Sequence, residues 1–408
     1  MPNGNYYTAA KLSAALAAGN TSTAAIADTC RRVLQGWFAL SPDRRHPCGG
    51  GVCIDANVST PAHKALAREV AAKSTVLLKN EGGLLPLGRG LSLALIGKDA
   101  TAPYTAGQGS GGVVTNAVVS PLAALAAAGA RVTYSDGSNA TAAAAAAAAA
   151  DVAIVFGHAE SGEGHDRSTL ALAGGTDALI PLVAAANPRT LVYMAVPGST
   201  RTDWRASVPA ILVTFLPGEQ IGPALVDVLY GAVPPQGKLP VTFPLGENDL
   251  QLSPAQYPGV PGGGFPVQTN YSEGLLIGHR GYERMGLAPA YPFGHGLTYG
   301  SFTYSGLSVS GRDVSFTLTR SAGSLGCDTP QLYLGWPTAA SDPRVPLKVL
   351  KAFEKVCAPS AQVTFTVTDA QVSNWDAASG AWAVTHGVYA VSVGSSSADI
   401  RLTGQLTV

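Results

Sequence analysis

The 408-residue chain is longer than one ordinary domain, because single cores stop growing at about 250 to 300 residues, so two or three units are expected. Lysine plus arginine equals aspartate plus glutamate at 26 each, and the 13% of charged residues form no basic block. This balance lacks the electrostatic footprint of a nucleic-acid binder. No apolar run approaches the roughly 18 residues of a membrane helix, so no membrane partner is expected.

Several features are typical of an exported protein, although the N-terminus has neither the basic nor the apolar region of a signal peptide. Asn-x-Ser/Thr sequons begin at Asn20, Asn57, Asn139 and Asn270. Cys48 and Cys53 flank a glycine-rich loop and can close a small disulfide ring. Cys327 and Cys357 can form a second pair, which leaves Cys30 free. We therefore expect a secreted protein whose natural chain begins further upstream.

The first two-thirds of the chain predict helices and then an α/β domain. Helical spacing of Ala, Leu and Ile predicts helices within residues 1–40. Residues 41–75 are interpreted as a linker that ends in a helix predicted over 63–78. Within residues 76–245, strands are predicted at 91–96, 131–134, 152–156, 190–196 and 210–215, and helices near 121–128, 141–150, 175–186 and 220–230. Apolar strands separated by helices indicate a parallel sheet covered on both faces.

The last third predicts an irregular connection and a β-sandwich. Residues 246–300 are rich in Gly, Pro and aromatic residues and are interpreted as the connection. Residues 301–408 predict short strands at 302–309, 313–318, 330–336, 349–356, 362–367, 382–384, 388–393 and 400–406. No exposed aromatic row can be identified in this sandwich, and Trp336, Trp375 and Trp382 are interpreted as core residues.

One loop gathers chemically active side chains. The strand at 152–156 leads into Gly157-His-Ala-Glu-Ser-Gly-Glu-Gly-His-Asp-Arg167, which holds three carboxylates, two imidazoles and one guanidinium. Open α/β sheets bind ligands beyond the carboxyl ends of their strands, and glycines let such a loop bend tightly. The position indicates a functional loop; a merely solvated surface loop is the alternative.

Other enzyme classes find little support in the motifs. Gly107-Gln-Gly-Ser-Gly-Gly112 formally matches the dinucleotide-binding fingerprint. That fingerprint requires a strand directly before its first glycine and a helix that begins at its last glycine. Here about ten residues separate the end of the predicted strand at Ile96 from Gly107, and the next helix begins only near Ser120. The chain has no Gly-x-Ser-x-Gly, His-Glu-x-x-His or Cys-x-x-Cys segment. We therefore predict no cofactor and no metal.

A series of segments runs in order along nearly the whole chain. They are Ser74-Thr-Val-Leu-Leu-Lys-Asn-Glu-Gly-Gly-Leu-Leu-Pro-Leu87, Ser161-Gly-Glu-Gly-His-Asp-Arg167, Pro217-Gly-Glu-Gln220, Gly237-Lys-Leu-Pro240, Tyr271-Ser-Glu-Gly274, Gly278-His-Arg280 and Pro292-Phe-Gly-His-Gly-Leu-Thr-Tyr299. Together they closely resemble glycoside hydrolase family 3. Downstream, Gln331-Leu-Tyr, Leu350-Lys-Ala-Phe353 and Trp375-Asp376 are similar to that family's fibronectin type III-like domain.

The resemblance implies a division of labour between domains. Family members have an N-terminal (β/α) barrel whose aspartate is the nucleophile, followed by an α/β sandwich domain that supplies the general acid/base. In many members the acid/base is the Glu of a Gly-Glu-Gly-x-Asp-Arg stretch, which falls here on Glu163. Asp166, Arg167 and His165 are then expected to bind substrate or to position the loop. Residues 1–40 are interpreted as the C-terminal remnant of the barrel.

The implied mechanism needs more than this chain offers. Retaining hydrolysis uses two carboxyl groups about 5 to 5.5 Å apart, and Glu163 can be only one of them. We find no nucleophile in this chain and expect it to be inactive without the missing barrel segment. The full-length protein is expected to hydrolyse terminal non-reducing β-D-glucosyl residues of a β-glucoside or oligosaccharide. A β-xylosidase of the same family and a non-catalytic sugar-binding or assembly module are the alternatives; the oligomeric state is left open.

Overall fold

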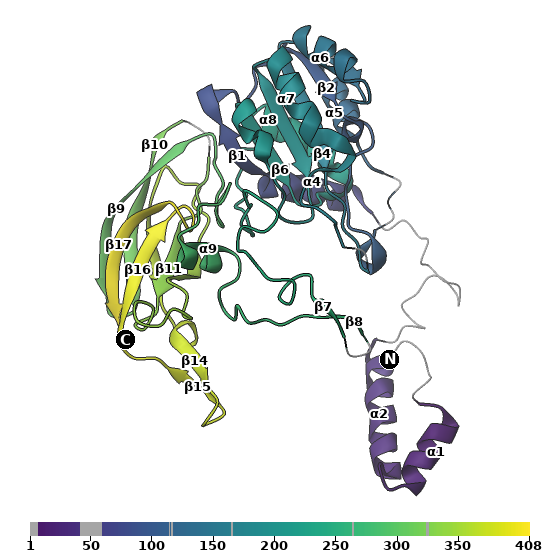
Figure 1. Cartoon of the computed structure of the whole chain (residues 1–408), viewed down its shortest axis with the longest axis vertical. Helices are drawn as coiled ribbons and strands as arrows, with labels where there is room; N and C mark the ends of the chain where they lie inside the picture. Colours follow the sequence, from purple (N-terminus) through teal and green to yellow (C-terminus); the bar gives the residue numbers. More distant parts are fainter. Residues whose placement is uncertain are drawn as a thin grey trace. The chain divides into compact units, whose positions relative to one another are not determined.

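The computed structural model describes residues 7–40, 59–113, 115, 117–164, 166–262, 265–323 and 326–408. The chain divides into two compact units, Met1–Thr60 and Pro61–Val408. The first unit contains helices α1 (Ala9–Ala17) and α2 (Thr23–Leu40), drawn in purple in Figure 1. The hydroxyl of Thr8 accepts a hydrogen bond from the Lys11 N–H at 3.3 Å and so caps α1.

The second unit begins with a mostly parallel sheet. Its strands are β1 (Val76–Asn80), β2 (Ser92–Ile96), β3 (Arg131–Ser135), β4 (Val152–His158), β5 (Thr190–Ala195) and β6 (Ala210–Thr214), in the order β1-β6-β5-β4-β2-β3. The neighbouring strands β6–β5, β5–β4, β4–β2 and β2–β3 pair in parallel. Strand β1 lies at the edge of the sheet and pairs antiparallel with β6. The strands β4, β5 and β6 are almost continuously buried, which explains their unbroken apolar sequences.

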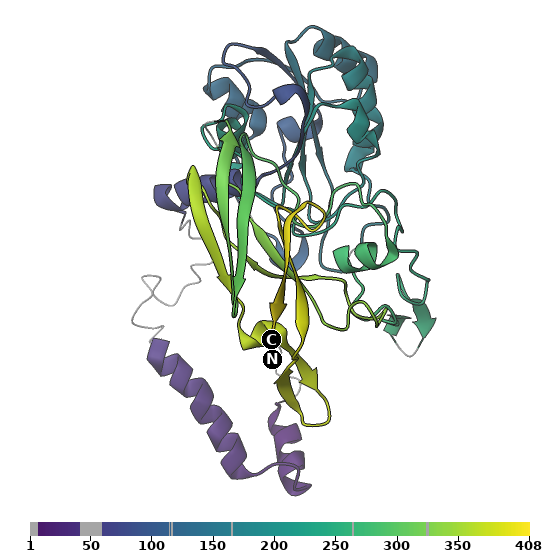
Figure 2. The same cartoon turned by 90° about the vertical axis from the view of Figure 1, so that its left-hand side faces the viewer.

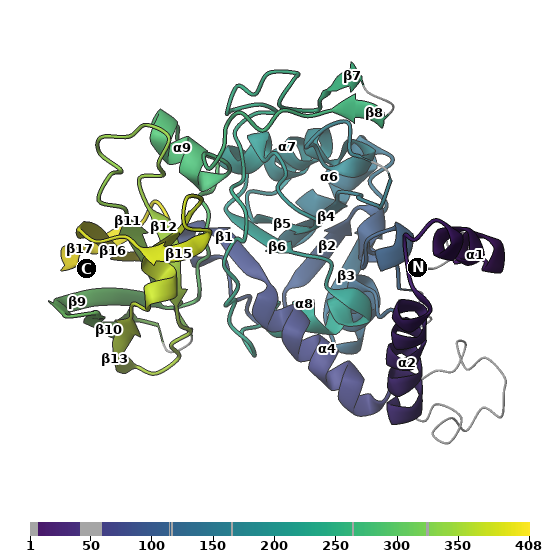
Figure 3. The ribbon, with the colours of Figure 1, turned by 90° about the horizontal axis from the view of Figure 1, so that it is seen from below.

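Helices cover both faces of this sheet, as predicted. They are α4 (Pro61–Ser74), α5 (Pro121–Ala127), α6 (Ala140–Ala148), α7 (Thr176–Ala186) and α8 (Ile221–Leu229). Figure 3 shows α6 and α7 on one face and α4 and α8 on the other. Each face has its own apolar core, in which Ile180 of α7 and Leu225 of α8 are almost fully buried. The alanine run is a helix because Asn139 caps it and because Ala143 and Ala147 fit against the sheet.

The helix predicted over 63–78 is wrong at its C-terminal end. Helix α4 stops at Ser74, and residues 76–80 form strand β1. Val76, Leu77 and Leu78 are at most 2% exposed, and Val76 lies opposite Val213 of β6. Helical spacing continued past Ser74 in the sequence, but pairing with the edge of the sheet satisfies the backbone and buries three consecutive apolar side chains.

The C-terminal part of this unit is the predicted β-sandwich (Figure 2). One sheet has the order β13 (Ser360–Thr366), β10 (Asp313–Ala322), β9 (Ser301–Ser310); the other has the order β12 (Val349–Phe353), β11 (Gln331–Gly335), β16 (Val388–Gly394), β17 (Ile400–Thr407). A shared core that includes Phe316, Leu334 and Val391 lies between the sheets. The predicted disulfide Cys327–Cys357 is present and Cys30 is free, whereas Cys48 and Cys53 lie outside the described residues.

Two of the three tryptophans assigned to the core are exposed instead. Trp375 and Trp382 are 56% and 70% exposed on a hairpin of β14 (Ser373–Asp376) and β15 (Ala381–Val384). They face each other across the hairpin with ring centroids 5.8 Å apart. This two-stranded hairpin is not part of either sandwich sheet, so its side chains are not enclosed between the layers. Trp336 does pack against the sandwich core.

The connection between the α/β sheet and the sandwich carries little regular structure. It contains β7 (Val260–Gly262), β8 (Phe265–Gln268) and α9 (His279–Met285). Lys238 Nζ, in the segment after α8, lies 2.9 Å from Asp328 Oδ1 and so ties the α/β part to the sandwich. Short 3-10 turns occur at Glu81–Gly83, Lys98–Ala100, Gly109–Gly111, Ala173–Gly175, Asp203–Ser207, Gly218–Gln220 and Asp369–Val372.

Two surface properties bear on the export prediction. The sequon residues Asn20, Asn139 and Asn270 are exposed, and Asn57 lies outside the described residues. Among the helices in the described ranges, none has the length and apolar character needed to cross a membrane. Glycosylation and secretion remain predictions.

Candidate active site

The predicted functional loop lies at the carboxyl edge of the sheet and pairs with a second loop. Strand β4 has parallel neighbours β2 and β5, so the loops that follow all three strands leave from the same edge. Gln108, after β2, forms a parallel bridge with Gly162, after β4. The Gln108 N–H donates to Ser161 O at 3.1 Å, and the Glu163 N–H donates to Gln108 O at 3.4 Å. The loop after β2 is therefore part of the site.

Only one of the two carboxylate oxygens of Glu163 is hydrogen-bonded within the described residues. Its Oε2 accepts hydrogen bonds from the Ser110 N–H at 3.0 Å and from the Ser110 hydroxyl. Its Oε1 has no hydrogen-bond partner among the described residues, and Glu163 is exposed. Two donors fix one carboxylate oxygen, and the exposed side chain can still contact a molecule bound at this edge of the sheet.

Glycine at position 109 is explained by close approach to Glu163. Gly109 has a φ of +77°, and a Cβ there would lie 2.5 Å from the Cβ of Glu163. Any side chain would therefore strain the backbone and push the Glu163 segment away. The Gly107–Gly112 segment, which resembles a nucleotide fingerprint in sequence, lets two loops touch.

Tyr104 and His158 support the base of the Glu163 loop. The Tyr104 hydroxyl donates to Ser161 O at 3.0 Å and accepts from the Ser161 N–H at 3.1 Å. The ring of Tyr104 stacks on His158 with centroids 5.4 Å apart. His158 in turn contacts Asp99, with Nδ1 to Oδ2 at 2.8 Å. These contacts fix the main chain two residues before Glu163.

Electrostatics at this support favour a charged imidazole. Asp99 is 9% exposed, and its hydrogen bond raises the pKa of His158 above the ordinary 6.5, against the opposing effect of burial. Glu160 Oε1, 3.4 Å from His158 Nε2, acts in the same direction. Glu160 thus contacts the imidazole of His158, whereas Glu163 accepts hydrogen bonds from Ser110.

The other predicted site residues separate in the structure. Arg167 Nη2 donates to Ser199 O at 3.0 Å, so it holds the loop against the segment after β5. Asp166 is exposed and makes no ion pair with Arg167 or with any other described residue. His165 lies outside the described residues.

Sequence reasoning missed Ser110, Tyr104 and Asp99 as partners of this loop. Ser110 was available as the only hydroxyl within Gly107-Gln-Gly-Ser-Gly-Gly112, but nothing local says which loop that segment will meet. The meeting depends on β2 and β4 being neighbours in the sheet although β3 lies between them in the sequence.

The fold and this loop define the class of protein. Residues 75–299 match the glycosyl hydrolase family 3 C-terminal domain, and residues 328–397 match the fibronectin type III-like domain. The chain belongs to glycosyl hydrolase family 3. The α/β sheet followed by a β-sandwich is the architecture of that family's C-terminal portion.

Individual relatives agree with the family assignment. The chain is 35% identical to a probable beta-glucosidase L of Emericella nidulans, over 100% of this chain and 62% of that protein. It is 32% identical to thermostable beta-glucosidase B of Acetivibrio thermocellus, over 98% of this chain and 55% of that protein. A solved beta-glucosidase from Chaetomella raphigera superposes with a TM-score of 0.86 at 31% identity, covering 99% and 64% of the two chains. The chain thus spans less than two-thirds of the length of these relatives.

Proposed function

We propose that this chain is the acid/base-bearing part of a retaining β-glucosidase and that Glu163 is its general acid/base. The observation that carries the proposal is the carboxylate of Glu163, in which Oε2 accepts hydrogen bonds from Ser110 while Oε1 stays accessible. It lies on a loop at the carboxyl edge of an α/β sheet, where such folds bind ligands. The relatives named as beta-glucosidases support glucose as the sugar and β as the configuration of the bond that is cleaved.

Glu163 would act in both steps of the reaction. In the first step it donates a proton to the glycosidic oxygen while a carboxylate nucleophile attacks the anomeric carbon, and the leaving alcohol departs. In the second step the ionised Glu163 removes a proton from water, which attacks the glycosyl-enzyme and releases the sugar with retained configuration. We assign the nucleophile to the barrel domain that the family resemblance implies, and therefore expect the 408-residue chain alone to be inactive.

The neighbouring residues would orient this proton transfer. Ser110 would fix the rotamer of Glu163, and Arg167 would hold the loop through Ser199. Asp166, exposed two residues beyond the glycine that follows Glu163, is free to contact a hydroxyl of the sugar. Catalytic groups held by their own hydrogen bonds need less reorganisation in the transition state.

The proposal is tested with the full-length protein and an aryl β-glucoside whose leaving group needs protonation. We expect Glu163→Ala to lower kcat by about 10² to 10⁴. On an activated aryl β-glucoside, whose leaving group needs no protonation, azide should restore part of the turnover of Glu163→Ala, because the small anion enters the space of the lost carboxylate and attacks the glycosyl-enzyme. Glu354→Ala, at an exposed glutamate in the sandwich part of the chain, is the matched control and should leave kcat unchanged.

Three results would contradict the proposal. Unchanged activity in Glu163→Ala would remove Glu163 from the acid/base role. Hydrolysis of an aryl β-xyloside in preference to the glucoside would instead assign the β-xylosidase alternative. If the full-length protein binds sugars but cleaves neither substrate, the non-catalytic module is the correct description.

A further inference from the structure

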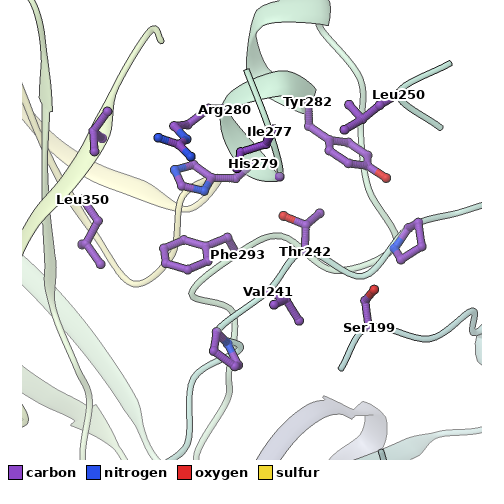
Figure 4. A pocket seen from close by; sticks show the side chains of 14 residues that line it. Ser199, Val241, Thr242, Leu250, Ile277, His279, Arg280, Tyr282, Phe293 and Leu350 are labelled. Carbon is purple, nitrogen blue, oxygen red and sulfur yellow. The ribbon is translucent and has the colours of Figure 1, made fainter. Parts of the chain in front are cut away.

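A cavity lies apart from the loops around Glu163. It has a volume of about 480 Å³ and is lined by the connection between the sheet and the sandwich, by Ser199 and by strand β12. Figure 4 shows Arg280, His279 and Phe293 along one side, with Thr242 and Tyr282 facing them. This volume is in the range of sites that hold a small molecule.

Arg280 is a cation that has no counter-ion among the described residues around this cavity. Its guanidinium has no hydrogen bond or ion pair with any part of the chain that the structure describes. No carboxylate belongs to the residues that line the cavity. Arginine presents several N–H donors in a planar fork that matches two oxygens of a carboxylate or phosphate. A partly buried, unpaired fork is therefore set for an oxyanion.

Two further polar groups in the wall have unused hydrogen-bonding atoms. Oγ1 of Thr242 and Nε2 of His279 are both buried and have no partner among the described residues. Burial lowers the pKa of His279 to about 4, assisted by Arg280 and Lys348, so the ring is neutral near pH 7. Its ring stacks on Phe293 at a centroid distance of 4.5 Å, which fixes its orientation. Buried polar atoms usually have hydrogen-bond partners, so these two unpartnered atoms are available to a bound ligand.

Two acidic side chains beside the cavity wall, Asp249 and Glu283, have other partners. Asp249 Oδ2 accepts a hydrogen bond from the Tyr282 hydroxyl at 2.8 Å and another from the Leu245 N–H at 2.7 Å. Glu283 Oε1 lies 2.7 Å from Lys348 Nζ, in a smaller adjoining cavity of about 220 Å³. Neither carboxylate forms an ion pair with Arg280. The local charge of the larger cavity is therefore positive.

We propose that this cavity binds a small organic anion and that the Arg280 guanidinium forms an ion pair with its oxyanion group. The cavity volume of about 480 Å³ leaves room for a ligand with one sugar ring. Its oxygen atoms bond to Thr242 and His279, and its apolar face lies near Phe293. A sugar carboxylate and a sugar phosphate share this chemistry. The site is independent of Glu163 and stands whether or not the proposed hydrolysis does.

The test measures binding to the full chain by calorimetry with glucuronate, glucose 6-phosphate and glucose. Glucuronate and glucose differ at one carbon, where a carboxylate replaces a neutral group, so their comparison isolates the charge. We expect at least one of the two anions to bind and glucose to bind far more weakly at this site. The anion that binds more tightly identifies carboxylate or phosphate as the preferred group.

Variants of the chain assign the binding to this cavity. Arg280→Gln should weaken anion binding about tenfold or more, because a charge-assisted pair is lost. Arg280→Lys keeps the charge but not the planar fork and should give an intermediate loss. Arg189→Gln, at an exposed arginine outside this cavity, is the matched control and should bind as the parent chain does.

Thermal melting of each variant reports whether it folds. If Arg280→Gln does not fold, Arg280→Lys and Thr242→Val carry the test, and the threonine change should weaken binding about fivefold through one lost hydrogen bond. Equal binding by Arg280→Gln, binding of glucose as tight as that of the anions, or no binding of either anion at millimolar concentration would each overturn the proposal.

Discussion

Ser110 donates both its backbone N–H and its hydroxyl to one oxygen of Glu163, although the two residues lie 53 positions apart in the chain. The contact joins the loop after β2 to the loop after β4 and leaves the second carboxylate oxygen accessible. A side chain held in this way has a defined direction toward any molecule bound at the edge of the sheet. Ser110 is therefore a positioning residue for the proposed acid/base.

Removing the Ser110 hydroxyl should impair catalysis more than binding. We expect Ser110→Ala to lower kcat on an aryl β-glucoside about tenfold in the full-length protein, with KM changed little, since one hydrogen bond to a charged group is lost. Ser168→Ala, at an exposed serine just after the loop, is the control and should match the parent protein. A change confined to KM would show that Ser110 acts on substrate binding instead.

Gly109 and Gly111 offer a paired test of loop contact. Gly109→Ala should lower activity about tenfold or more, because a Cβ would lie 2.5 Å from the Glu163 Cβ and because the φ of +77° disfavours alanine. Gly111→Ala meets nothing within 4 Å and should be tolerated. Steady-state kinetics and thermal melting of both variants separate activity from stability. Equal kinetics in the two variants would contradict the importance of this contact.

The His158–Asp99 pair should make stability depend on pH. The pKa of His158 is raised in the folded protein, so its contribution is complete below the ordinary 6.5 and is lost as pH rises through the raised value. Asp99→Asn should therefore cost more stability at about pH 6 than at about pH 9, as measured by urea unfolding. His386→Ala, at an exposed histidine in the sandwich part of the chain, should show no such difference. A pH-independent loss in Asp99→Asn would point to packing alone.

The disulfide should stabilise the sandwich. Cys327 and Cys357 are 30 positions apart, and closing a loop of that length is worth about 3.6 kcal/mol through the entropy of the unfolded chain. The double variant Cys327→Ser, Cys357→Ser should lose stability of that order in denaturant unfolding. Cys30→Ser replaces an exposed free cysteine and should leave the unfolding curve in place. Identical curves for the double variant and the parent would show that the crosslink adds nothing.

Local patterns in the sequence were sufficient for the class of fold. Buried strands such as 152–156 are continuous apolar runs, and the sandwich strands alternate, because these patterns follow from how many faces of a strand are covered. The helix start at Ser120 and Pro121 was also predictable, since a cap is a contact between near neighbours in the chain. The family motifs pointed to Glu163, and its role remains a prediction.

Contacts between distant segments were decided by the tertiary structure alone. Residues 76–80 continue a helical pattern but form a strand, because the edge of β6 offers hydrogen bonds that local sequence does not reveal. Trp375 and Trp382 are exposed because their hairpin lies outside both sandwich sheets. Ser110 meets Glu163 only because the sheet places β2 beside β4. Sequence periodicity reports which faces are buried, whereas the partner on each face depends on strand order, which the local pattern does not encode.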